Sequence, residues 1–240
     1  MTNDGLEEPR KMKRRRRPVR RWLVRLAFVL AVLALAPILL VPLYAVVNPP
    51  WSTLQAWQTL TGVKTTRSWV PLEDISPNLV NAVMMSEDGQ FCSHDGIDWA
   101  SLREVIGSDA ARPRGASTIP MQVAKNLFLW PSRSYLRKGI ELPLAWYMDF
   151  VWSKRRMMEI YLNIVEWGPG VFGAEAAAQH WFGKPAATLS RSEGARLAVV
   201  LPNPARRNPR DAGPTVRRLS QIVERRARQA GAYIGCLESP

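Results

Sequence analysis

The stretch YMDFVWSKRRMMEIYLNIVEWG, residues 147–168, carries the strongest structural signal in the chain. Its apolar positions recur at intervals of three and four: Tyr147, Phe150, Val151, Met158, Tyr161, Leu162 and Val165. This spacing places side chains on one face of an α-helix. Gly168-Pro169-Gly170 would end such a helix. We therefore predict one long amphipathic helix over 147–165, in a mainly α protein.

The neighbouring sequence favours further helices. Their predicted ranges are 77–88, 99–106, 118–127, a short Ala-rich helix between Gly173 and Gly183, and 191–201. The residues expected to cap these starts are Ser76 with Pro77, Asp98, Ser117, and Ser190 with Glu193. Alternating strand patterns are scarce, and no repeat of a solenoid period occurs. The expected fold class is mainly α.

The N-terminus differs from the rest of the chain. The 240 residues carry a formal net charge of +13, and residues 1–25 alone hold ten Lys/Arg and three acidic residues. Residues 26–47 carry no charge, and at ~1.5 Å per residue a helix of that length crosses a ~30 Å hydrocarbon core. A signal peptide cleaved after Ala34-Leu35-Ala36 is the alternative. An uncleaved anchor is favoured, because Pro37 follows directly and the apolar run is longer than signal sequences use.

These observations divide the chain into four predicted segments. They are a basic cytoplasmic tail (1–25), a transmembrane anchor (26–47), a juxtamembrane connector (48–70) and a globular domain (71–240). Because basic flanks stay in the cytoplasm, the domain should lie on the opposite side of the membrane. At 47% hydrophobic residues the chain is not disordered. Cys92 and Cys236 cannot form a disulfide framework, and we expect both to be free.

The stretch SEDGQFCSHDGID, residues 86–98, holds the first candidate site residue. Glu87 falls at the C-terminal end of the predicted helix 77–88. The negative end of a helix dipole raises the pKa of a carboxylate, which suits a proton acceptor near neutral pH. A lone Glu in such a place is more often only solvated. For His94 and Asp98, a mutual hydrogen bond is expected in preference to a metal pair.

A basic cluster follows. In GASTIPMQVAKN, residues 115–126, Gln122 and Lys125 share one helix face. Lys125, Arg133, Arg137 and Lys138 place four cations within 14 residues, and Arg binds phosphate oxygens through paired hydrogen bonds. Arg137 and Glu141, four residues apart, could equally form an ordinary surface ion pair.

Two carboxylates and a basic cluster are what glycosyl transfer from a diphosphate donor requires. One carboxylate takes the acceptor proton, and cations stabilise the departing diphosphate in an oxocarbenium-like transition state. Spacing alone leaves two alternatives open: a lytic transglycosylase or lysozyme-like hydrolase, and a non-enzymatic membrane-tethered adaptor.

The same stretches resemble the signatures of glycosyltransferase family 51, the peptidoglycan transglycosylases. EDGQFCSHDG resembles E-D-x-x-F-x-x-H-x-G, GASTIPMQVAKN resembles G-G-S-T-I-T-Q-Q-x-x-K-N, RKGIE resembles R-K-x-x-E, and KRRMMEIYLN resembles K-x-x-I-L-E-x-Y-L-N. The likeness runs in order over roughly residues 65–210. No transpeptidase-like stretch follows, so a monofunctional member is expected.

The resemblance implies a lysozyme-like, two-lobed glycosyltransferase domain over 71–240 that acts on lipid II and the nascent glycan strand with inversion. Glu87 would be the general base, and Glu141 would hold the basic site or assist the leaving group. Substrate-binding positions would be Asp88, Phe91, His94, Thr118, Gln122, Lys125, Asn126, Arg133, Arg137 and Lys138. Glu159, Tyr161 and Asn163 would be scaffold residues.

The resemblance also carries expectations about surroundings. The location would be the bacterial inner membrane, with a single pass, a cytoplasmic N-terminus and a periplasmic domain. Cell-wall synthesis or division proteins are candidate partners, and nucleic acid is not expected. No metal ligands or certain cofactor are implied, although Mg or Mn could assist at the diphosphate. Three departures are specific. Ala116 replaces the second Gly, Pro120-Met121 replaces T-Q, and Gly139 and Pro143 should weaken a helix around Glu141.

Overall fold

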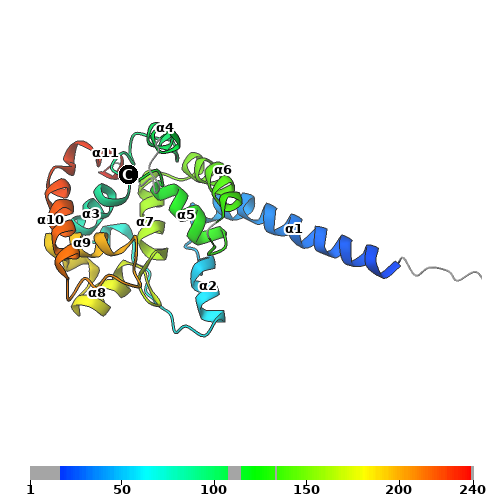
Figure 1. Cartoon of the computed structure of the whole chain (residues 1–240), viewed down its shortest axis with the longest axis horizontal. Coiled ribbons are helices and arrows are strands. Elements are labelled where there is room, and N and C mark those ends of the chain that lie inside the picture. The colour runs from blue at the N-terminus through cyan, green and yellow to red at the C-terminus, as the bar shows by residue number, and fades with distance from the viewer. Residues whose placement is uncertain (1–16, 108–114, 133, 239–240) are drawn as a thin grey trace, which may run out of the picture. The chain divides into compact units, whose positions relative to one another are not determined.

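The computed structural model describes residues 17–107, 115–132 and 134–238 (Figure 1). The chain divides into two compact units, Met1–Leu40 and Val41–Pro240. The regular structure of the second unit is mostly helical, which confirms the predicted mainly α class.

The helix α1 spans Arg17–Tyr44. Its segment Arg20–Tyr44 is long and apolar enough to cross a membrane, as the apolar run predicted, and it is the one such helix in the described chain. The last residues of α1 belong to the second unit. There the indole N–H of Trp152 donates to the carbonyl of Val41 at 2.7 Å, and the Arg156 guanidinium donates to the carbonyl of Tyr44 at 2.9 Å.

The second unit contains ten further α-helices within the described residues. They are α2 Thr53–Leu60, α3 Pro77–Glu87, α4 Trp99–Gly107, α5 Ile119–Phe128, α6 Tyr135–Val151, α7 Lys154–Ile164, α8 Ala174–Phe182, α9 Arg191–Val200, α10 Pro214–Arg228 and α11 Gly235–Glu238. Three short 3-10 turns add to them: η1 Leu72–Asp74, η2 Ala186–Thr188 and η3 Ala230–Ala232.

Most predicted helix starts are confirmed by their caps. The Ser76 side chain accepts the N–H of Asn78, Asp98 accepts the N–H of Ser101, and Ser190 and Glu193 form the expected capping box. The start of α5 was predicted one residue early. Thr118 is the N-cap of this helix, because its hydroxyl accepts the N–H of Met121.

The single long helix predicted over 147–165 is wrong, because two helices, α6 and α7, share this stretch. Trp152 adopts extended geometry and closes α6. The Ser153 side chain then accepts the N–H of Arg156 at 3.1 Å and starts α7. An N-cap serine restarts a helix even where the apolar period runs on past it.

A small sheet lies beside these helices. Its strands β1 Thr66–Arg67, β2 Glu166–Gly168 and β3 Val171–Phe172 stand in the order β1-β3-β2, with β1 parallel and β2 antiparallel to β3. The region 48–70, predicted as a connector, thus contributes a strand as well as α2, which packs against α5.

Helices of the second unit pack in two groups. In one, α3 packs against α9 and α10, and the backbones approach so closely that a Cβ on Gly194 would lie 2.9 Å from the carbonyl of Asn78. In the other, α5 packs against α6 and α7. The core side chains Trp167, Tyr161 and Met157 are fully buried. The C-terminal end of α3 and the exposed side of α5 frame the candidate site.

The expectation that Cys92 and Cys236 are free is wrong, because they form a disulfide with a Cα–Cα distance of 5.5 Å. Packing of α11 against α7 brings the two cysteines together, and Arg155 on α7 donates to the carbonyl of Leu237. A separation of 144 residues gives no hint of this pairing.

Candidate active site

Glu87 is the last residue of α3, and its carboxylate is held by neutral groups. Gln122 of α5 donates its amide N–H to Glu87 Oε2 at 3.0 Å, and Ser86 also hydrogen-bonds to the carboxylate. Burial raises the pKa of Glu87 above its ordinary value, although Gln122 and the nearby Lys125 partly oppose that rise. A carboxylate with a raised pKa can accept a proton near neutral pH.

Tyr161 of α7 fixes the orientation of Gln122. The Tyr161 hydroxyl donates to Gln122 Oε1 at 3.0 Å, so the amide NH₂ is left to face Glu87. Burial raises the pKa of Tyr161 well above its usual value, and the hydroxyl therefore stays protonated. The chain from Tyr161 through Gln122 to Glu87 joins the scaffold helix α7 directly to the candidate base.

Glu141 on α6 is surrounded by cations. Arg137 and Lys138 form ion pairs with its two oxygens, the Lys138 Nζ–Oε2 distance being 3.0 Å. Glu141 is only 2% exposed. The pair with Arg137 is therefore largely buried, which excludes the alternative of an ordinary surface ion pair. Helix α6 runs unbroken through Gly139 and Pro143, so these residues do not displace Glu141.

Lys125 on α5 interacts electrostatically with both carboxylates. Burial lowers the pKa of Lys125, whereas attraction to Glu141 and, more weakly, Glu87 raises it. With Asn126 and Arg137 it lines a pocket of about 240 Å³, whose other walls come from Leu54 and the segment 129–132. The pocket thus offers two cations to an anionic group that enters it.

Comparisons with known proteins agree with this geometry. Residues 54–229 match the transglycosylase family profile. A biosynthetic peptidoglycan transglycosylase of Agrobacterium fabrum is 57% identical over 216 residues, which cover 89% of this chain and 96% of the relative. The proteins of the same description from Mesorhizobium japonicum and Rhizobium meliloti are 55% and 53% identical, covering 93% and 89% of this chain and 96% and 92% of the relatives.

The chain belongs to the transglycosylase family. It is therefore an enzyme of glycosyl transfer, and the adaptor alternative loses its basis.

Several predicted substrate-binding residues of this transglycosylase lie in the interior. Asp88 accepts the N–H of Ile119 at the start of α5, and Phe91 is fully buried beneath Lys154. The Thr118 hydroxyl donates to the carbonyl of Gly96, and the Asn126 side chain is also largely buried. These contacts fix the loop after Glu87 against α5, in contrast to the direct substrate contact expected for Asp88, Phe91 and Thr118.

The predicted hydrogen bond between His94 and Asp98 does not form. His94 Nε2 instead lies 3.0 and 3.1 Å from the two oxygens of Asp88. Asp98 accepts hydrogen bonds from the backbone and hydroxyl of Ser101, because it caps α4. Within the described residues no group of three or more His, Cys, Asp or Glu could hold a metal ion.

The structure brings Glu87, Gln122 and Lys125 together, and links Lys125 electrostatically to Arg137, Lys138 and Glu141. Arg133 lies outside the described residues. Glu159 and Asn163 are scaffold as expected: Asn163 holds the backbone of Val70, and Glu159 accepts the N–H of Leu72.

Arg207 was missed. It follows α9, donates to the carbonyl of Val199 and attracts the carboxylate of Glu87. Only its place in the LPNPARRNP stretch could have pointed to it.

Of the departures from the family pattern, Pro120 lies in the first turn of α5 and Met121 is buried. Gln122, which donates to Glu87, is retained next to them.

Proposed function

We propose that this transglycosylase polymerises lipid II into β-1,4 glycan strands, with inversion and release of undecaprenyl diphosphate. The observation that carries the proposal is the pair of unlike carboxylates beside Lys125: Glu87, held by neutral groups, and Glu141, ion-paired to two cations. The names of the curated relatives, biosynthetic peptidoglycan transglycosylases, support the peptidoglycan substrate.

In the proposed reaction, the Glu87 carboxylate accepts the proton of the acceptor sugar's 4-hydroxyl. That oxygen forms a bond to the anomeric carbon of the donor, while the bond from that carbon to the diphosphate oxygen breaks. The electron pair leaves with the diphosphate. General-base catalysis of this kind contributes typically ~10²–10⁴-fold to a rate.

Lys125 and Arg137 are proposed to bind the departing diphosphate. Both line the pocket beside α5, and the Lys125 ammonium group forms no hydrogen bond with the described residues. Preorganised cations stabilise charge that develops in a transition state. Glu141 acts as a positioning residue, because it contacts Arg137 and Lys138 and holds their side chains on the α6 side of the cleft.

A divalent cation fits these residues poorly. Of the two carboxylates near Lys125, Glu141 already bonds a cation, Arg137 or Lys138, through each of its oxygens, which leaves Glu87 as the single carboxylate available to a metal. Mg²⁺ and Mn²⁺ prefer carboxylate, carbonyl and water oxygens. We therefore propose that Lys125 and Arg137 supply the positive charge in this chain, and we derive no step through a metal.

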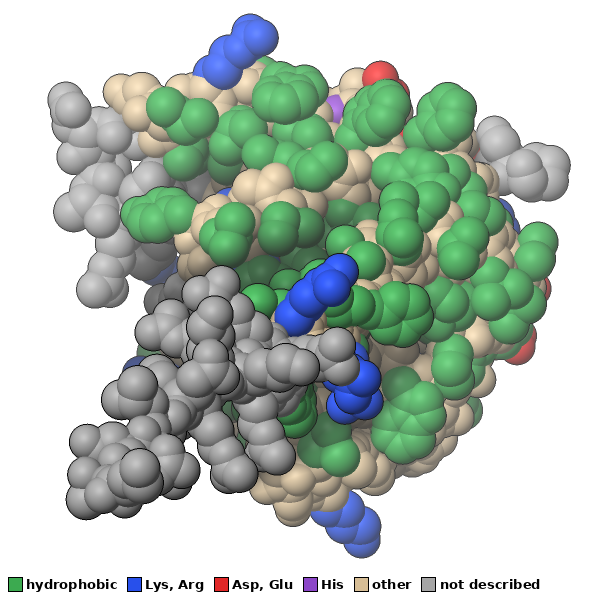
Figure 2. Space-filling view, turned by 90° about the vertical axis from the view of Figure 1, so that its right-hand side faces the viewer, with side chains coloured by type: hydrophobic (Ala, Val, Ile, Leu, Met, Phe, Trp, Pro, Cys, Tyr) green, Lys and Arg blue, Asp and Glu red, His purple; other side chains and the backbone are tan. Residues whose placement is uncertain are grey.

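Hydrophobic side chains on the second unit support work at a membrane surface. Tyr135, Leu136, Ile140 and Phe150 of α6, with Trp57 of α2, are exposed. Figure 2 shows hydrophobic side chains over much of the face that it draws, which includes those of the apolar helix α1. The apolar segment of α1 fits a single-pass anchor. We propose that the membrane is the bacterial inner membrane, with the N-terminus cytoplasmic and the domain periplasmic. A disulfide agrees with an oxidising compartment.

The test supplies the purified full chain with lipid II and, in parallel, with intact sacculi. Formation of long glycan from lipid II, without release of fragments from sacculi, is expected. Release of muropeptides without polymer formation would overturn the proposal in favour of a lytic enzyme. Partners among cell-wall synthesis or division proteins remain a proposal, which co-purification from crosslinked membranes tests.

A further inference from the structure

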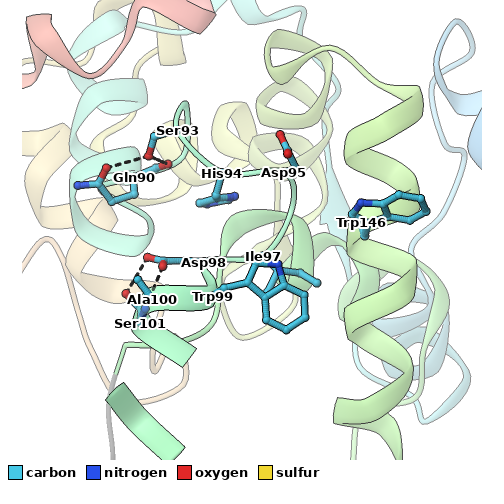
Figure 3. Close-up of a pocket in the computed structure, with 10 residues that line it drawn as sticks. All are labelled: Gln90, Ser93, His94, Asp95, Ile97, Asp98, Trp99, Ala100, Ser101 and Trp146. Carbon is cyan, nitrogen blue, oxygen red and sulfur yellow. Dashed lines mark hydrogen bonds between the residues drawn. The ribbon is translucent and has the colours of Figure 1, made fainter. Parts of the chain in front are cut away.

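A second, larger pocket lies apart from the diphosphate pocket. Its volume is about 650 Å³, and its walls come from the loop 90–98, the start of α4 and Trp146 of α6 (Figure 3). Lys125, Arg137 and Glu141 do not line it. Gly96 lets the loop pack tightly against α6: its φ is +80°, and a Cβ there would lie 2.7 Å from the carbonyl of Ala145. The loop backbone that forms this wall is thus held in close contact with α6.

His94 presents an unused hydrogen-bond acceptor in this wall. Its Nε2 lies within hydrogen-bond distance of both Asp88 oxygens, so Nε2 carries the proton in the neutral ring and Nδ1 is the acceptor. Nδ1 is buried without a hydrogen-bond partner among the described residues, and the His94 side chain is only 8% exposed. An unpaired buried acceptor costs free energy, and a ligand that donates a hydrogen bond would remove that cost.

The charged groups of the wall are acidic. Asp95 is exposed, and no described residue forms an ion pair or hydrogen bond with its side chain. Hydrogen bonds from Ser101 hold the pKa of Asp98 below its ordinary value, which keeps this carboxylate charged. No Lys or Arg is found among the described lining residues. The wall therefore favours a cation and disfavours phosphate.

Two indoles complete the wall. Trp99 and Trp146 are about half exposed and both line the pocket, as Figure 3 shows. Aromatic faces attract cations and also cover alkyl groups. The pocket therefore combines hydrogen-bond acceptors, negative charge and indole surface. A ligand that suits all three is a cation that donates hydrogen bonds and carries an alkyl group.

We propose that this pocket binds a primary ammonium group. Its N–H groups would donate to the exposed Asp95 carboxylate and, once the His94 ring turns its buried Nδ1 toward the pocket, to that nitrogen, with the adjoining carbon chain against Trp99 and Trp146. Two sources carry this group: the amino group of the peptide on a peptidoglycan precursor, and the ethanolamine headgroup of a membrane lipid. Only the first source rests on the proposed function.

The test uses the two histidines of the chain, His94 and His180, as probes. The full chain in detergent is labelled with ¹⁵N in the histidine rings, and His180→Gln assigns the His94 signals. On titration with n-butylammonium chloride, the Nδ1 signal of His94 should shift saturably, while His180 signals stay in place. Neutral n-butanol and tetramethylammonium, which lack the charge and the N–H donor respectively, should bind at least ~10-fold more weakly.

Matched variants test the acidic wall. Asp95→Asn should weaken butylammonium binding by about 2–5-fold, the range expected for a partly exposed ion pair. Asp74→Asn, at an exposed position of η1 outside the pocket, should leave binding unchanged. An unmoved His94 signal, or equal responses to butylammonium and butanol, would overturn the proposal. None of these measurements requires turnover, so their failure is distinct from failure of glycan polymerisation.

Two further titrations identify the source. Lipid II with a free peptide amine is compared with its N-acetylated form, and vesicles rich in phosphatidylethanolamine are compared with phosphatidylglycerol vesicles. A His94 shift specific to the free amine indicates the precursor, and one specific to phosphatidylethanolamine indicates the lipid. If neither titration moves a signal that butylammonium moves, both proposed sources are wrong and only the ammonium site stands.

Discussion

The two carboxylates near Lys125, Glu87 and Glu141, are chemically the same group in opposite surroundings. Glu87 ends a helix, accepts its hydrogen bonds from the neutral Gln122 and Ser86, and has a pKa raised by burial. Glu141 lies within a helix, bonded to Arg137 and Lys138. A carboxylate bonded to neutral groups remains free to take a proton. One already compensated by two cations serves better to hold those cations in place.

Replacing Glu87 by Gln should have the largest effect. The amide keeps the size of the side chain but cannot accept the acceptor sugar's proton, so polymerisation should fall by ~10²–10⁴-fold. A gel assay of glycan formed from lipid II measures this loss. Glu73→Gln, at a side chain that is 63% exposed, is the matched control and should retain activity. Near-normal polymerisation by Glu87→Gln would remove this residue as the base.

Replacing Glu141 by Gln should act on stability first and on turnover less. Removing one partner of a buried ion pair costs about 3–5 kcal/mol, because the remaining charges stay uncompensated. Polymerisation should drop roughly 10-fold through misplaced cations. Denaturant unfolding and the lipid II assay measure the two effects.

The matched control for Glu141 is Glu224→Gln. Glu224 forms an exposed pair with Arg228 at the same four-residue spacing, so its replacement should cost no more than about 1 kcal/mol. A Glu141→Gln enzyme as inactive as Glu87→Gln, yet fully stable, would contradict the division of roles between the two carboxylates.

The pH dependence of kcat/KM should separate the two carboxylates further. Activity should rise with pH along a limb whose apparent pKa lies above about 4.3, the ordinary value for Glu. Because Lys125 lowers the pKa of Glu87, Lys125→Met should move this limb to higher pH in its residual activity. Glu141→Gln should shift the apparent pKa of this limb less than Lys125→Met does. An acid limb whose apparent pKa lies at or below the ordinary value for Glu would contradict the prediction.

The same raised pKa predicts a sign for stability. The folded chain binds the Glu87 proton more tightly than the unfolded chain, so this stabilisation is present below the unfolded pKa and is lost as pH rises through the folded pKa. Glu87→Gln should therefore leave Tm at neutral pH unchanged or slightly raised, and a clearly lowered Tm would contradict this expectation.

The smallest expected effect on turnover comes from the disulfide, which joins the loop after Glu87 to α11. Cys92→Ser should lower the free energy of unfolding by about 2–5 kcal/mol, the usual contribution of a disulfide that closes a long loop. Polymerisation at 25 °C should change little, since the hydrogen bonds of Asp88 still hold the loop. Equal unfolding curves with and without reductant would contradict this prediction.

Local signals predicted most of the helices and part of the site. Caps such as Ser76 and Ser190 act within one turn, so their residue types can be read directly from the chain. Ser153 is also a local signal, but the apolar period on both sides concealed the break it makes.

Long-range packing accounts for what the sequence did not predict. The pairing of Cys92 with Cys236, the burial of Glu141 and the approach of Arg207 to Glu87 join distant segments. The spacing of residues along the sequence does not predict contacts of this kind. The link from Tyr161 to Gln122 likewise depends on how α7 packs against α5.

The bond between Cys92 and Cys236 makes a closed covalent ring of the chain from the loop after Glu87 to the last helix. One proteolytic cut anywhere inside the ring would leave the two fragments attached to each other. Both α5 and α6, with Lys125 and Glu141, lie inside it. A nicked enzyme would thus keep Glu87, the proposed base on the segment before the ring, covalently joined to the residues proposed to bind the diphosphate.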